Sequence, residues 1–104
     1  MRLPTIPTAI RPGDRIQALV AQAYGVSEAA LKGVRGPAEI MDARHVAMYL
    51  TRIVTRRSLP QIARDFGGRH HTTVLDAVDR IEKTRCEWPE FDQFVRKLEA
   101  EIRQ

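Results

Sequence analysis

Apolar residues recur along this chain at the spacing of amphipathic helices. After Asp14, which we take as an N-cap, they fall at i, i+3, i+4 and i+7, and Gly25 ends the predicted helix. Ser27 starts a short helix that closes near Leu31. A long helix is expected over about 39–54, where one apolar stripe consists of Ile40, Ala43, Val46, Ala47, Leu50, Ile53 and Val54.

Two shorter patterns follow and are separated by a pair of glycines. Ser58 is a good N-cap, and Pro60 is tolerated in a first helical turn, where its missing N–H has no partner in any case. Gly67 and Gly68 supply the positive φ angles that a tight turn between helices requires. The next helix, about 70–86, is expected to bury Val74, Leu75, Val78 and Ile81.

A last helix is expected after Trp88-Pro89, with its apolar face made by Phe91, Phe94, Val95, Leu98 and Ile102. No stretch alternates in the manner of a β-strand, so the pattern predicts an all-α fold of about six helices. The length of 104 residues suits one domain, over 14–104, because it leaves no room for a second core. Residues 1–13 contain three prolines and are predicted to form a flexible N-terminal arm.

The glycine turn and its two flanking helices have the layout of a helix-turn-helix. The second helix opens with polar side chains that can donate to or accept from base edges, namely those of Arg69, His70, His71, Thr72 and Thr73. This pattern predicts a domain that reads DNA in the major groove.

Charge is distributed unevenly around this motif. Residues 44–85 hold nine basic and four acidic side chains, a net charge of +5, whereas residues 86–104 carry −2. A polyanion is therefore expected to bind on the motif side, with the tail directed away from it. A basic surface that serves only solubility is the alternative that charge alone leaves open.

These residues resemble the C-terminal DNA-binding domain, domain IV, of the bacterial replication initiator DnaA. The resemblance is carried by Gly67-Gly68-Arg69, by the run from His71 to Leu75 and by Ser58-Leu59-Pro60, with Ala43-Arg44-His45-Val46-Ala47-Met48 upstream. It spans roughly residues 16–83. It implies an all-α, Trp-repressor-like fold with double-stranded DNA as the partner, and no cofactor.

The resemblance also implies roles for particular side chains. Bases are expected to be read by His71, Thr72 and Thr73, and we add the adjacent His70, because imidazole and hydroxyl groups exchange hydrogen bonds with base edges and the threonine methyl suits thymine. Backbone contacts are assigned to Arg35, Arg44, Arg52, Arg56, Arg57, Ser58, Leu59 and Arg69.

The chain departs from that family in three ways. His70 stands where members carry an acidic residue, so the preferred bases can differ. The loop that reaches the minor groove keeps only Arg35, which weakens reading there. The printed sequence contains no GxxxxGK[ST] phosphate loop, so it holds no nucleotide-binding module. We expect a free-standing monomer that regulates replication initiation or transcription.

Other classes of function receive little support from the sequence. The side chains of adjacent histidines point in different directions on a helix, and no Cys and His residues have the spacing of a zinc site, so no metal site is predicted. No catalytic function is predicted either. The lone Cys86 and the lack of a long apolar run suggest a cytoplasmic, nucleoid-associated protein with no membrane partner. The alternative function is a protein-interaction adaptor that uses Trp88, Phe91 and Phe94.

Overall fold

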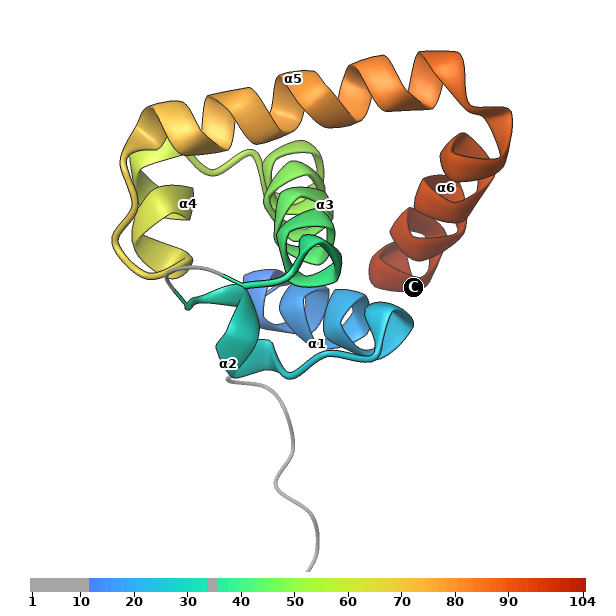
Figure 1. Ribbon diagram of the computed structural model, residues 1–104. Coiled ribbons are helices and arrows are strands. Elements are labelled where there is room, and N and C mark those ends of the chain that lie inside the picture. Colours follow the sequence, from blue (N-terminus) through green and yellow to red (C-terminus); the bar gives the residue numbers. More distant parts are fainter. Residues whose placement is uncertain (1–11, 34–35) are drawn as a thin grey trace, which may run out of the picture.

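The computed structural model describes residues 12–33 and 36–104, which form six helices and no strands (Figure 1). These helices are α1 (Pro12–Tyr24), α2 (Glu28–Leu31), α3 (Ala38–Thr55), α4 (Leu59–Asp65), α5 (His71–Glu87) and α6 (Pro89–Arg103). The predicted all-α class is confirmed, and every expected helix is present within three residues of its predicted ends. Helix α1 begins at Pro12, two residues before the predicted cap, and residues 1–11 of the predicted arm lie outside the described part.

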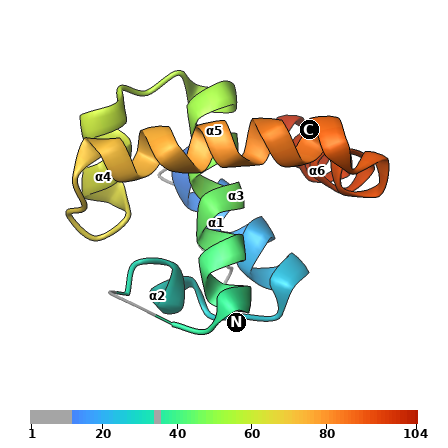
Figure 2. The same cartoon turned by 45° about the horizontal axis from the view of Figure 1, so that its top comes forward.

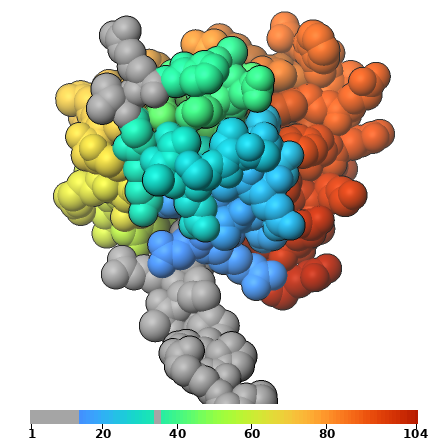
Figure 3. All heavy atoms as spheres, turned by 60° about the horizontal axis from the view of Figure 1, so that its bottom comes forward, coloured from blue at the N-terminus to red at the C-terminus, as the bar shows by residue number. Residues whose placement is uncertain are grey.

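Helix α3 is the centre of the domain, since it packs against each of the other five helices. Its middle is buried almost all round, including Val46, Met48 and Leu50, each of which has no exposed surface. Helix α5 crosses over α3, with α4 beneath its first turns and α6 folded back from its far end (Figures 1 and 2). Helices α1 and α2 cover the opposite side of α3 and lie between α4 and α6 in Figure 3.

A polar cluster joins the C-terminal half of α5 to two other helices. The Arg85 guanidinium pairs with the Asp92 carboxylate of α6 at 2.5 Å and donates to the Tyr49 hydroxyl of α3 at 2.8 Å. The hydrogen bond from Arg85 lowers the pKa of Asp92, which therefore stays ionised and bound. Together with the buried Val95, Leu98 and Ile102 of α6, this cluster joins α6 to α5 and α3.

Helix α5 presents its polar stripe outward because only one narrow face is buried. Val74, Ala77 and Ile81 form that face, and Val78 packs at its edge. The expectation that Leu75 is buried is wrong, since 51% of its surface is exposed. Successive helical residues are separated by about 100°, so a residue next to the buried Val74 turns away from α3.

Candidate nucleic-acid interface

The turn between α4 and α5 takes its shape from two glycines. Gly67 and Gly68 have φ angles of 96° and 77°, as their sequence predicted. A side chain on Gly67 would clash with the Lys32 carbonyl oxygen just after α2, whereas a side chain on Gly68 would meet nothing within 4 Å. Because Gly67 has no side chain, the turn packs closely against the backbone that follows α2. This contact fixes the start of α5 relative to the domain.

Helix α4 begins with a capping box. The Ser58 hydroxyl accepts from the Gln61 N–H, and the Gln61 side chain accepts from the Ser58 N–H. Leu59 lies half-buried against the core, so its side chain serves packing and only its backbone amide is available to a phosphate. Ile62, Ala63 and Phe66 are buried and anchor the inner side of this segment.

His70 is the N-cap of α5 and precedes the helix, whereas the sequence placed it inside. Its Nδ1 accepts from the Thr72 N–H at 3.2 Å and lies 2.8 Å from the Thr72 hydroxyl oxygen. The rings of His70 and His71 are stacked with their centres 4.5 Å apart. His70, His71 and Thr72 are exposed and Thr73 is half-buried. The structure therefore brings all four predicted base-reading residues to the outward first turn of α5.

Leu75 extends this surface by one turn and was missed as a surface residue by sequence reasoning. It follows Thr72 by three positions and His71 by four, so the three side chains share one side of the helix. An exposed leucine beside hydroxyl and imidazole groups adds apolar area that suits a thymine methyl group. Its position four residues after His71 was the only signal in the sequence.

Arg44 was expected to grip the DNA backbone, and the structure shows that its side chain is buried. Only 1% of its surface is exposed. Its guanidinium donates to the Leu31 and Ala30 carbonyls at 2.9 and 2.8 Å. Burial first, and then the charge of Arg69, lower its pKa. Arg44 thus stabilises the C-terminus of α2 by satisfying carbonyls that a four-residue helix leaves free.

Arg69 has a related structural role. Its guanidinium donates to the Gly33 carbonyl in the loop after α2, and burial lowers its pKa. The side chain is half-buried, so it joins the turn to that loop and is less available to a phosphate than the sequence suggested. Arg35, the remaining basic residue of the expected minor-groove loop, lies outside the described residues.

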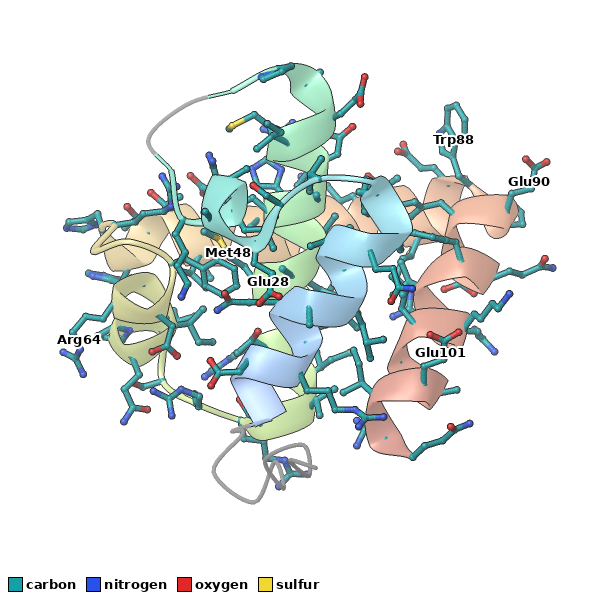
Figure 4. All side chains as sticks on the ribbon, turned by 90° about the horizontal axis from the view of Figure 1, so that it is seen from below. Glu28, Met48, Arg64, Trp88, Glu90 and Glu101 are labelled. Carbon is teal, nitrogen blue, oxygen red and sulfur yellow. The ribbon has the colours of Figure 1, made fainter. Side chains whose placement is uncertain are left out.

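The arginines between α3 and α4 differ in how far they are committed to other contacts. Arg52 donates to the Arg57 carbonyl at 2.6 Å, and Arg57 forms an ion pair with Asp65 at 2.9 Å. Arg56, in a left-handed conformation with a φ of 58°, is exposed. Arg64, which sequence reasoning did not select, is also exposed and points outward from α4 in Figure 4. Among the arginines at positions 52–64, Arg56 and Arg64 are therefore the most accessible.

The far end of α5 has a different character. Trp88 is 63% exposed and points away from the domain (Figure 4), whereas Phe91 and Phe94 pack partly against the core. A hollow of about 320 Å³ beside Trp88 is lined by residues of α1, α3, α5 and α6. Trp88 is separated from the first turn of α5 by the length of the helix, about 24 Å. The two surfaces are therefore distinct.

Two further observations describe the chain as a whole. Among residues 12–33 and 36–104, no three His, Cys, Asp or Glu side chains are grouped to hold a metal ion. No helix in the same ranges has both the length and the apolar character that crossing a bilayer requires.

An exposed polar first turn on α5, set against α4 by a tight glycine turn, defines a DNA-binding helix-turn-helix domain. Comparison with known proteins agrees, because residues 13–81 match the family model described as bacterial dnaA protein helix-turn-helix. The chain belongs to this bacterial DnaA helix-turn-helix family.

Several full-length proteins, each called chromosomal replication initiator protein DnaA, are similar to this chain. The protein of Rhodopseudomonas palustris strain TIE-1 is 51% identical over 79 residues, which cover 76% of this chain and 16% of that relative. The Mesorhizobium japonicum protein is 51% identical over 76 residues, 73% of this chain and 15% of its own length. The Xanthobacter autotrophicus protein is 49% identical over 79 residues, which cover 76% of this chain and 15% of that relative. The chain thus matches about a sixth of these relatives.

Proposed function

We propose that this domain reads a specific duplex sequence by docking the first turn of α5 in the major groove. The observation that carries the proposal is the joint exposure of His70, His71 and Thr72 on a turn seated by Gly67. These groups offer hydrogen bonds that distinguish bases, which a phosphate-binding surface alone does not need. Leu75 adds a contact for a thymine methyl group.

The target we propose is an initiator-type site at an origin or a promoter. Support comes from the relatives, whose name assigns them to the initiation of chromosome replication. Because the printed sequence has no phosphate loop, the role that fits it is occupation of such sites or competition for them, without catalysis or nucleotide-driven assembly. We propose that one chain binds one non-palindromic site as a monomer in the bacterial nucleoid.

Backbone contacts are proposed for the rim of the turn. Arg56 and Arg64 are exposed cations there, and the half-buried Arg52, Arg57 and Arg69 add positive charge behind them. Ser58 caps α4 and Leu59 is its first residue, directly after Arg56 and Arg57. Contacts of this kind supply affinity and orientation without selecting bases.

Selection of bound sequences from a random duplex pool tests the proposal. We expect one motif to be enriched, and the affinity for it to fall steeply as salt is raised, because phosphate contacts release counterions. Sedimentation of the complex should give one chain per site. Recovery of a pool with no preferred bases would contradict base reading.

The adaptor hypothesis rests on a different observation, the 63% exposure of Trp88 beside the hollow. An adaptor on this scaffold would show neither a preferred duplex nor a steep salt dependence. The Trp88→Ala variant separates the two functions. A DNA reader keeps its duplex affinity after this change, because Trp88 lies at the far end of α5.

A further inference from the structure

His70 and Thr72 fix each other's hydrogen-bond polarity at the interface. The Thr72 backbone N–H can only donate, and it donates to Nδ1 of His70 at 3.2 Å. Nδ1 must therefore carry its lone pair, which places the proton of the neutral ring on Nε2. Because this Nδ1 has no proton to give, the Thr72 hydroxyl, whose oxygen lies 2.8 Å away, acts as a second donor that shares the same lone pair.

The outward faces of the two side chains follow from this pair of contacts. His70 is exposed and presents an Nε2–H donor, while the Thr72 oxygen presents its lone pairs. The ring of His71 stacks on the ring of His70, with the two centres 4.5 Å apart, and this contact restricts rotation of the His70 ring. The first turn of α5 thus carries a donor at residue 70 and an acceptor at residue 72.

We infer that His70 favours guanine over cytosine at the base it faces, by donating from Nε2 to guanine O6 or N7, and that Thr72 accepts from an adenine or cytosine amino group. This inference rests on the proposed function. In the major groove guanine presents two acceptors and cytosine only a donor, so a fixed donor discriminates against cytosine. Residue 70 is therefore a determinant of which site this chain binds.

Two variants of residue 70 form a matched pair for the test. Asparagine and aspartate are both good N-caps of nearly equal size, so each keeps the cap on α5. With one oxygen on the Thr72 N–H, His70→Asn presents an amide donor outward, whereas His70→Asp presents a carboxylate acceptor. The variants differ in the polarity of the outward group and in one charge.

Sequence selection with the three chains gives the decisive comparison. We expect the natural chain and His70→Asn to prefer guanine over cytosine at one position by about tenfold, and His70→Asp to reverse that preference. Each preference is the ratio of a chain's affinities for the two duplexes. It is therefore unaffected by the general loss of affinity that a new negative charge causes. Identical preferences in all three chains would overturn the inference and leave the proposed function standing.

A measurement without DNA tests the tautomer itself. Two-bond proton–nitrogen correlation spectra of the free protein at about pH 8, where imidazole is neutral, report which ring nitrogen carries the proton. We expect His70 to be protonated on Nε2. We also expect the Thr72→Val variant to keep the hydrogen bond from the backbone N–H of residue 72 to His70 Nδ1. Protonation on Nδ1 would overturn the inference. If the natural chain enriches no sequence at all, the proposed function fails and this inference fails with it.

Discussion

Thr72 is the residue on which the proposed base reading depends most directly. Thr72→Ala removes the hydroxyl and the methyl from the exposed first turn of α5. We expect it to weaken binding to the selected site by about 1–3 kcal/mol and to change binding to random DNA little. Titration of both duplexes with natural and variant chains measures the difference. Equal losses on the two duplexes would contradict base reading by Thr72.

Arg44 and Arg56 are both arginines of the predicted DNA-binding set, yet their surroundings predict opposite effects. Arg44→Met removes the buried donors to Ala30 and Leu31, so we expect it to lower the free energy of unfolding by about 2 kcal/mol. Arg56→Gln removes an exposed charge, so it should leave stability unchanged and weaken binding to all duplexes alike.

Chemical denaturation and duplex titration of the two variants separate these roles. A fully stable Arg44→Met variant with weakened DNA binding would return Arg44 to the interface. The sequence did not distinguish the two residues, because both are arginines close to the predicted helix-turn-helix and carry the same charge. Only the short α2, folded against α3, supplies the carbonyls that draw Arg44 inside.

At the scale of elements, the turn between α4 and α5 decides where α5 begins. Gly68→Ala forces a side chain into a positive φ in open space, which costs about 1–2 kcal/mol. Gly67→Ala adds a clash with the Lys32 carbonyl, so we expect a clearly larger loss of stability and weaker DNA binding. Thermal melts and duplex titrations compare the two glycine variants. Equal effects would show that the close contact between Gly67 and the Lys32 carbonyl is unimportant.

Helix α5 also carries charge that opposes its proposed role. Asp76 is exposed one turn after Thr72 on the same stripe, and Asp79 follows it with Lys83 at 3.5 Å. We expect Asp76→Asn to tighten duplex binding several-fold, because it removes repulsion from phosphates. Asp79→Asn should have less effect, since Asp79 is farther along the helix and has a cation beside it. A larger effect at Asp79 would move the DNA surface toward the far end of α5.

The elements themselves were predictable because each has a local signal. Ser27 and Ser58 cap their helices, Gly25 and Gly67 adopt positive φ angles, and the apolar stripes have helical spacing. Local signals failed for Leu75, whose apolar side chain was assigned to the core. The width of the buried face of α5 depends on how α3 and α4 pack beneath it, which periodicity does not report.

For the whole molecule, His45 links stability to pH. Burial, then the charge of Arg80, lower its pKa in the fold from the value near 6.5 of an unfolded chain. The folded state therefore binds fewer protons, and this contribution to stability is complete above about pH 6.5 and diminishes as the pH falls below it. Denaturant midpoints should decrease between about pH 7.5 and 5.5, and less so in His45→Gln. Equal slopes in both chains would contradict this assignment.

The linear pattern of the chain was enough to establish six helices, a helix-turn-helix and the polar first turn of its second helix, because spacing, caps and glycines act over a few residues. Tertiary packing decided which cations are free and which apolar side chain is exposed. Arg44 and Arg69 bind carbonyls around α2, far from them in sequence, and Leu75 turns away from α3. Burial is a property of the assembled helices, so no single segment contains it.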